Sequence, residues 1–249
     1  MLRLEKPDSI RKEIRASIAP RWRYLSRRIF KPNITNIDGF HIRVDLTRMN
    51  FQNAKLLYRG NYEAEERLII RTLLKPGDCV LEGGAGMGLI TMTAARIVGE
   101  KNVTSYEPVP TTYSLLSENL RTNNFKVRHI NRALGTKSGK ISFNAQDDLL
   151  SSSFLKREGK GRTIEVLTDD ITDALSESKA NVLILDVEGG EIELLNLNSF
   201  ARINKMIIEM HPQLVGIEAV SATAQKLSSV GLHLRRDCSY GKVLAFARK

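Results

Sequence analysis

The sequence predicts an α/β fold with a mostly parallel sheet that is covered by helices on both faces. From residue 78 onward, short apolar runs alternate with amphipathic segments of helical period. The last two apolar runs, 233–238 and 242–248, are separated only by Ser239-Tyr240-Gly241, so we expect an antiparallel pair. The length of 249 residues suffices for one well-buried domain of this kind with added elements.

Residues 1–60 precede this pattern and are predicted to form a basic extension of amphipathic helices and a β-hairpin. Residues 1–32 hold ten Lys or Arg against three acidic residues, so +7 of the net charge of +10 lies there. Apolar residues recur at helical spacing on both sides of Pro20, and the stretch 39–46 alternates apolar and polar residues. We expect the arm to pack on the domain, to join a second subunit in a homo-oligomer, or to contact an anionic membrane surface.

Residues 61–249 are predicted to form the main domain. An amphipathic helix over 58–74 leads into it and ends at the turn Lys75-Pro76-Gly77-Asp78. The apolar runs predict a Rossmann-like sheet of seven strands, the last antiparallel, at 78–82, 102–107, 126–134, 181–188, 205–211, 233–238 and 242–248. Helices are predicted at 88–98, 110–123, 191–197 and 216–230, and two extra strands at 140–144 and 163–168 flank a polar loop.

Composition limits the class of protein. No apolar stretch approaches the roughly 20 residues of a membrane span, and the N-terminus is too rich in arginine for a secretory signal. Cys79 and Cys238 lack metal-type spacing and are expected to be reduced core thiols inside strands. We therefore expect a cytoplasmic protein, with the basic arm compatible with a peripheral position at the inner membrane surface.

The stretch LEGGAGMG, residues 81–88, is a glycine-rich turn directly after a predicted strand, where backbone N–H groups approach a ligand. A P-loop is excluded because Gly88 is followed by Leu89-Ile90 instead of Lys and Ser or Thr. A dinucleotide fingerprint fits poorly because its third small residue falls on Leu89. The remaining pattern, acid-x-Gly-x-Gly-x-Gly, matches the first motif of class I methyltransferases and predicts S-adenosylmethionine as the ligand.

The predicted contacts of the methionine part of this cofactor are Glu82, Gly83, Gly84, Ala85, Gly86 and Met87. The glycines allow the backbone to pass beneath the ligand, and the Glu82 carboxylate can engage its ammonium group. Glu107 ends the second strand, 19 residues after Gly88, where its carboxylate can accept hydrogen bonds from both ribose hydroxyls. The alternative for Glu107 is a cap for the helix that begins near Pro110.

A second group of polar residues lies in LILDVEGGEIELL, residues 183–195. Asp186 and Glu188 follow a buried strand and should face the cleft at the carboxyl end of the sheet. An uncompensated buried carboxylate is costly, so Asp186 is expected to have a functional partner. Glu191 is expected to complement the N-terminus of the next helix.

His211 follows the neighbouring strand, KMIIEMH, so adjacent strand tips should bring it near Asp186 and Glu188. It is either structural, or a general base or hydrogen-bond partner of a substrate. Asp186, Glu188 and His211 are thus the candidate catalytic residues. Their ligand types would permit a metal ion, but nothing in the spacing demands one, and we expect none.

The sequence resembles the FkbM family of methyltransferases over about residues 62–211. The stretches that carry the resemblance are Tyr62-Glu63, Glu82 to Gly88, Glu107-Pro108, Asn119, Ala133-Leu134, Gly139, Leu167 to Asp170, Leu185 to Gly189 and Ile208 to His211. The resemblance implies S-adenosylmethionine-dependent O-methylation of a hydroxyl on a sugar, a glycan or a secondary metabolite, with Glu63, Pro108, Ala133 and Asp186 also at the cofactor. The chain departs from the family pattern at Glu82, Gly86 and Gly190, where the family usually has Asp, Asn and Ala.

Two alternatives stay open at this point. The basic arm suggests an RNA methyltransferase, although aromatic residues make up only 6% of the chain and no RNA-binding module is recognisable. A non-catalytic scaffold that retains the fold would bind the cofactor without turnover. For the enzyme, methyl transfer is an in-line displacement at a sulfonium, and a base near the acceptor hydroxyl assists its deprotonation.

Overall fold

The computed structural model describes residues 21–146, 161–196 and 200–249, so the predicted helix before Pro20 lies outside the described residues. The main sheet has seven strands, as predicted, and its strands in spatial order are β11 (His233–Leu234), β12 (Val243–Ala247), β10 (Lys205–Glu209), β9 (Val182–Leu185), β3 (Val80–Gly83), β4 (Val103–Tyr106) and β5 (Arg128–Ile130). The strands from β10 to β5 pair in parallel, and β12 is antiparallel to both of its neighbours. The predicted fold class is confirmed.

Helices cover both faces of this sheet because successive side chains of a strand point to opposite sides. In β9, Val182 and Ile184 join one buried cluster, and Leu183 and Leu185 join the other. The first cluster includes α4 (Ala64–Leu73), α5 (Leu89–Val98) and α6 (Pro110–Thr122). The second includes α7 (Ile171–Glu177), α8 (Glu191–Leu195) and α10 (Ile217–Ser229). The continuous apolar runs of the sequence are thus strands buried on both faces.

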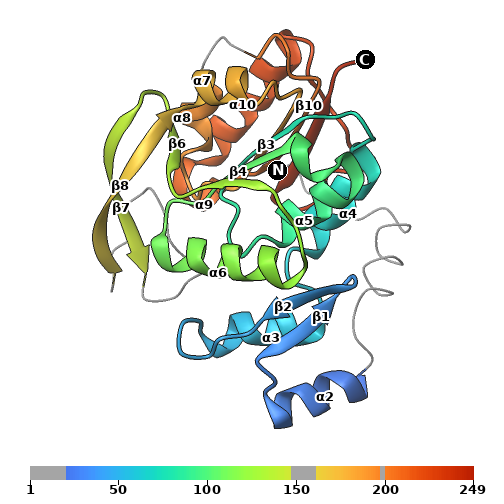
Figure 1. Ribbon diagram of the computed structural model, residues 1–249. Coiled ribbons are helices and arrows are strands. Elements are labelled where there is room, and N and C mark those ends of the chain that lie inside the picture. The colour runs from blue at the N-terminus through green and yellow to red at the C-terminus, as the bar shows by residue number, and fades with distance from the viewer. Residues whose placement is uncertain (1–20, 147–160, 197–199) are drawn as a thin grey trace.

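A second sheet of three strands lies beside the main one and extends away from it (Figure 1). Its order is β6 (Ala133–Gly135), β8 (Gly161–Asp170) and β7 (Gly139–Gln146). The two extra strands are confirmed, but the single strand predicted over 126–134 is wrong. The chain leaves the main sheet after Ile130, and Ala133–Gly135 pairs in parallel with β8.

The predicted helix over 58–74 is also wrong, because the chain forms two helices there. Helix α3 (Phe51–Arg59) begins after Asn50, whose side chain accepts from the N–H of Asn53. It ends at Gly60, which adopts a left-handed conformation with φ of 76°.

The expectation that Cys79 and Cys238 lie inside strands is wrong as well, since Cys79 directly precedes β3 and Cys238 lies in a turn.

The extension contains α2 (Arg21–Phe30) and a hairpin of β1 (Ile34–Ile37) and β2 (Phe40–Arg43), as predicted. The hairpin and α3 lie next to α6 (Figure 1), and the backbone N–H of Arg43 donates to Asn119 Oδ1 at 2.9 Å. Helix α2 contacts α3, where Arg27 donates to the carbonyl of Tyr58 at 3.0 Å, but Ile29 is 72% and Phe30 80% exposed, so these two apolar side chains stay largely uncovered. A second subunit or an anionic surface as their partner, and a domain boundary at residue 60, stay predictions.

Two short elements complete the fold, the 3₁₀-helix η1 (Glu100–Asn102) and the helix α9 (Pro212–Val215). Within the described ranges, none of these helices has both the length and the apolar character that crossing a membrane requires.

Candidate active site

The carboxyl ends of four neighbouring strands meet at one edge of the main sheet. Gly83, at the end of β3, pairs with Tyr106 of β4 and with Leu185 of β9, which in turn pairs with Ile208 of β10. The segments that follow these strands carry His211, Asp186, the glycine-rich turn and Glu107, in that spatial order. The strand order reverses between β3 and β9, and open α/β sheets bind ligands at such a point.

The glycine-rich turn packs directly against the segment after β9. Gly84 has φ of +84°, and a Cβ at this position would lie 1.8 Å from the carbonyl oxygen of Asp186. The N–H groups of Gly84 and Ala85 both donate to the carbonyl of Tyr106 at 2.9 Å. Only glycine fits at residue 84, because both the conformation and the space exclude a side chain.

Gly86 occupies the turn for a different reason. Its φ is +53°, but a Cβ there would make only ordinary van der Waals contacts, 3.8 Å from Glu63 Oε1 and from the Tyr62 hydroxyl. Asparagine tolerates this left-handed region better than other residues with a side chain. Gly86 and the asparagine of the family pattern therefore suit the same backbone, and the departure from that pattern does not alter the turn.

Beneath the turn, the Met87 side chain is fully buried in the core and only its backbone borders the cleft side of the turn. Its carbonyl accepts a hydrogen bond from Asn119 Nδ2 at 2.9 Å. Because Asn119 Oδ1 also accepts from the N–H of Arg43, this buried amide ties the turn to the hairpin of the extension.

Glu107 is buried and its carboxylate is held by two backbone groups. Oε2 accepts from the N–H of Gly86 and Oε1 from the N–H of Val109, both at 2.9 Å. Burial raises the pKa of Glu107 to about 7, although these two hydrogen bonds oppose the rise. Glu107 thus caps the start of α6 and also contacts the glycine-rich turn. The carbonyl of Pro108 accepts from Asn131 Nδ2 at 3.1 Å, and Ala133 is buried in β6 close by in the chain.

The Glu82 carboxylate lies below the turn, between β4 and α5. Its Oε2 accepts from Ser105 Oγ at 2.5 Å and from Thr91 Oγ1 at 2.6 Å, and Oε1 is buried with no hydrogen-bond partner within the described ranges. Burial raises the pKa of Glu82, and the two hydroxyl groups oppose the rise. Contact of Glu82 with a cofactor ammonium stays a prediction, for which only Oε1 is free of a hydrogen bond.

Glu63 reaches the turn from the start of α4. It has φ of 49°, an unusual conformation for glutamate that costs roughly 1–3 kcal/mol. Its Oε2 is buried and has no hydrogen-bond partner in the part of the chain that the structure describes. Burial, followed by the charges of Glu66 and Glu82, raises the pKa of Glu63 well above its ordinary value, although a hydrogen bond with Tyr62 opposes the rise. A strained carboxylate with one unpartnered oxygen next to Gly86 is consistent with the predicted contact to a ligand.

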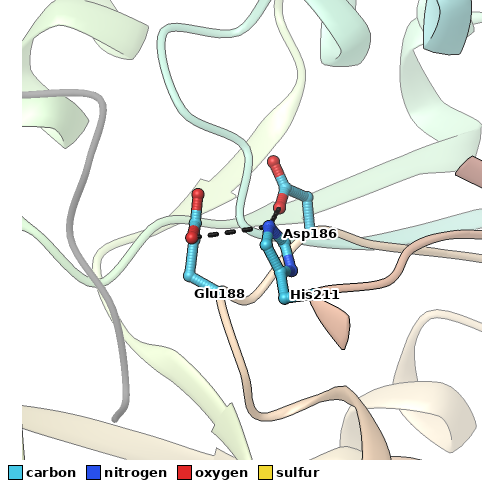
Figure 2. Close-up of side chains that lie close together, drawn as sticks. All are labelled: Asp186, Glu188 and His211. Atoms are coloured by element: carbon cyan, nitrogen blue, oxygen red, sulfur yellow. Dashed lines mark ion pairs between the residues drawn. The ribbon is translucent and has the colours of Figure 1, made fainter. Parts of the chain in front are cut away.

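The three candidate catalytic residues come together, as the strand order predicted. His211 Nε2 lies 3.4 Å from Glu188 Oε2 and 3.8 Å from Asp186 Oδ1, and points between the two carboxylates in Figure 2. His211 is 1% exposed, and Glu188 has φ of +50°, which turns its side chain toward the imidazole. We call Asp186, Glu188 and His211 the Asp–Glu–His cluster.

Glu191 orients the histidine of this cluster, a role that the sequence did not indicate. Its Oε1 lies 2.8 Å from His211 Nδ1, and both oxygens accept from the N–H of Gly189. Glu191 lies in the first turn of α8, as expected of a residue that complements a helix N-terminus, but it is also fully buried. Burial lowers the pKa of His211, but the Glu191 hydrogen bond and the charges of Glu188 and Glu191 outweigh it and raise the pKa.

Further acidic groups surround the cluster, and the sequence analysis missed Glu66 among them. Burial and the charge of Glu209 raise the pKa of Glu66 to about 8, and these two side chains share a hydrogen bond. Burial, then the charges of Glu209 and Glu188, raise the pKa of Asp186 well above its ordinary value. Lys242 Nζ lies 2.6 Å from Glu209 Oε1 and partly balances this charge. Glu66 lies on α4, far in the sequence from Asp186, Glu188 and Glu209, so only the fold reveals that it is near them.

Comparison with known proteins gives concordant matches. The methyltransferase FkbM domain model matches residues 84–238. Hexuronic acid methyltransferase AglP of Haloferax volcanii is 28% identical over 220 residues, which cover 84% of this chain and 87% of AglP.

Among solved structures, P. horikoshii TYW2 in complex with MeSAdo is 15% identical, with a TM-score of 0.48 over 91% of this chain and 80% of that one. M. jannaschii TYW2 in complex with AdoMet is also 15% identical, with a TM-score of 0.45 over 87% of this chain and 86% of that one. Since the FkbM model spans more than half of the sequence, the chain belongs to the FkbM family of S-adenosylmethionine-dependent methyltransferases.

Proposed function

We propose that this protein transfers the methyl group of S-adenosylmethionine to a hydroxyl group of a sugar. The observation that carries the proposal is the Asp–Glu–His cluster, which lies at the same edge of the sheet as the glycine-rich turn. Gly84 contacts the backbone of Asp186 directly, so a methyl donor on the turn has this cluster next to it. An acceptor that contacts the cluster would therefore be close to the donor, as in-line transfer requires.

The cofactor would lie across the turn. Glu107 would accept hydrogen bonds from the ribose hydroxyls, because its two oxygens each keep a lone pair beside their backbone donors. The methionine part would then extend over the backbone of residues 83–87 toward Glu63 and Asp186. These carboxylates are suited to the positive charges of the ammonium and sulfonium groups.

The cluster supplies what a hydroxyl acceptor needs. A sugar hydroxyl is a weak nucleophile until its proton is removed or shared, and a base within hydrogen-bond reach makes the transfer possible. Asp186, Glu188 and His211 Nε2 are all within reach of one another, so a hydroxyl placed among them has acceptors for its proton. As the oxygen–methyl bond forms, the carbon–sulfur bond breaks and its electron pair stays on the sulfur.

The similarity to AglP supports a sugar as the acceptor, and a hexuronic acid offers both hydroxyl groups and a carboxylate. The acidic residues of the cluster favour a hydroxyl group over the carboxylate as the methyl acceptor. A carboxylate acceptor needs no base, whereas a hydroxyl acceptor makes use of the proton acceptors Asp186, Glu188 and His211.

The test is methyl transfer by the purified full chain from isotope-labelled S-adenosylmethionine to separate pools of uronic acid glycosides, neutral glycosides and total RNA. We expect label in the uronic acid pool, in a product that resists mild alkali, because a methyl ether is stable where a methyl ester hydrolyses. Asp186→Asn should abolish the transfer in a folded protein. Alkali-labile label would identify a carboxylate acceptor instead, and label confined to RNA would overturn the proposal in favour of the RNA methyltransferase alternative.

A further inference from the structure

We propose that Asp186, Glu188 and His211 bind a divalent metal ion with a mixed preference for nitrogen and oxygen ligands, such as Mn²⁺. The sequence spacing did not demand a metal, and the inference comes from the folded arrangement. One ligand atom from each of the three residues lies within 4.8 Å of the other two. His211 Nε2 lies 3.4 Å from Glu188 Oε2 and 3.8 Å from Asp186 Oδ1 (Figure 2).

These separations suit a single ion. Metal–ligand bonds of about 2.1 Å place neighbouring ligands of an octahedral ion about 3 Å apart and opposite ligands about 4.2 Å apart. The two distances from Nε2 fall between these values, so small side-chain movements would bring all three atoms into one coordination shell. The backbone of Asp186 is already fixed, because its N–H donates to the carbonyl of Gly83 at 3.0 Å.

His211 is prepared as a ligand. Its Nδ1 bonds to Glu191 Oε1 at 2.8 Å, which directs Nε2 toward the two carboxylates. The side chain is only 2% exposed, and in the described part of the chain Nε2 makes no hydrogen bond that would use its lone pair. Metal-binding histidines characteristically have such a carboxylate behind the ring, because it fixes both the orientation and the tautomer.

Asp186 provides an independent observation. The Asp186 side chain is 37% exposed, but its Oδ1, the oxygen nearest to His211, is buried and has no hydrogen-bond partner among the residues that the structure describes. A buried carboxylate oxygen without a partner is costly, and a cation would satisfy it. Lys242 does not satisfy Asp186 Oδ1, because its ammonium group lies 2.6 Å from Glu209 Oε1 on the neighbouring strand.

The chemistry of the ligand set selects the kind of ion. Ca²⁺ prefers six to eight oxygen ligands, whereas imidazole with two carboxylates suits first-row divalent ions. If the proposed sugar methylation holds, the ion would also bind the acceptor hydroxyl and lower its pKa, so that its proton passes to a free carboxylate oxygen of the cluster and then to water. The ion would offset the negative charge that otherwise opposes a uronic acid.

Metal binding can be tested without an acceptor. The full chain is stripped with a chelator and titrated with Mn²⁺, with free Mn²⁺ followed by electron paramagnetic resonance. We expect one Mn²⁺ per chain, with affinity at least tenfold weaker in Glu188→Gln and in His211→Gln. Glu193→Gln, an exposed acid on α8, is the matched control and should leave the affinity unchanged.

Pulsed paramagnetic resonance should detect an imidazole nitrogen on bound Mn²⁺, and this signal should be lost in His211→Gln. Thermal unfolding checks that each variant is folded, and the partly exposed Glu188 gives a second test if His211→Gln does not fold. The absence of Mn²⁺ binding, equal affinity in the Glu188→Gln variant, or displacement of Mn²⁺ by S-adenosylhomocysteine would overturn the site. Mn²⁺ binding with this signal but without sugar methylation would leave the site standing and refute only the proposed function.

Discussion

His211 Nδ1 lies 2.8 Å from Glu191 Oε1, and both side chains are almost completely buried, at 2% and 0% exposure. The pair joins the end of β10 to the first turn of α8 and fixes the imidazole with Nε2 toward Asp186 and Glu188. Glu191 therefore positions the imidazole of His211, and in the proposed function it would act on the acceptor through His211.

Two replacements of Glu191 should distinguish its effect on the orientation of His211 from its effect on the stability of the fold. Glu191→Ala leaves His211 Nδ1 and the Gly189 N–H buried without a partner, so we expect a loss of about 2–3 kcal/mol in unfolding free energy in urea. Glu191→Gln keeps an acceptor and should stay folded, with kcat reduced about tenfold or more and unchanged affinity for S-adenosylhomocysteine. An equal loss of cofactor affinity in Glu191→Gln would indicate a structural role alone.

Two glycines of the turn should respond in opposite ways to substitution. Gly84→Ala should prevent cofactor binding and lower the melting temperature, because its Cβ would collide with the Asp186 carbonyl. Gly86→Asn should retain affinity for S-adenosylhomocysteine within about threefold, since asparagine tolerates φ near +53° and a Cβ at this position makes no closer than ordinary van der Waals contact. Calorimetry on both proteins checks this, and a comparable loss in Gly86→Asn would show that the family pattern matters here beyond backbone conformation.

Cofactor affinity should depend on pH through Glu107. Burial raises its pKa to about 7, and only the ionised carboxylate can accept from two ribose hydroxyls while it accepts from two backbone N–H groups. The ionised fraction grows as pH rises, so the affinity for S-adenosylhomocysteine should increase roughly 25-fold between pH 5.5 and 7.5 and then level off. Glu107→Gln should bind more weakly with a flatter profile, and identical profiles in the two proteins would remove Glu107 as the ribose ligand.

The Asp38 carboxylate should make the fold sensitive to acid. Arg67 is fully buried and donates to Asp38, and to the carbonyls of Gly60 and Tyr62 next to the site. Burial raises the pKa of Asp38, but hydrogen bonds and charges from Arg71 and Arg67 outweigh it and hold the pKa below 3.8. A carboxyl group whose pKa is lower in the folded state than in the unfolded state stabilises the fold. This stabilisation is complete at pH values above the unfolded-state pKa of 3.8, and it is lost as the pH falls through the folded-state pKa.

Asp38→Asn is therefore expected to lower the unfolding free energy at pH 7 by about 3 kcal/mol, because the Arg67 charge is left buried without its counter-ion. The difference from the unmodified protein should vanish below the folded pKa of Asp38. Urea unfolding at pH 7 and at pH 3 measures both quantities, and a difference that persists unchanged at pH 3 would contradict the assignment. Asp45→Asn is a suitable control, because Asp45 bonds only to exposed groups near it in the chain.

The sequence by itself determined the features that depend on local pattern. The apolar runs predicted the seven strands, the antiparallel end of the sheet and the extra strands beside it. Because parallel strands end at one edge, strand order was enough to bring His211 to Asp186 and Glu188. The spacing of the glycine-rich turn, together with Glu107 at the end of the next strand and the antiparallel end of the sheet, indicated the cofactor.

Tertiary structure decided the features that depend on how segments far apart in the sequence pack together. Helix α3 ends at Gly60, where periodicity alone would continue the helix. Strand β6 is separate from β5 because it pairs with β8. The bond between Glu191 and His211 joins side chains 20 residues apart, and it forms only because α8 and the end of β10 pack side by side. Burial raises the pKa of Asp186 and Glu66, and burial is a property of the packed molecule that no local pattern contains.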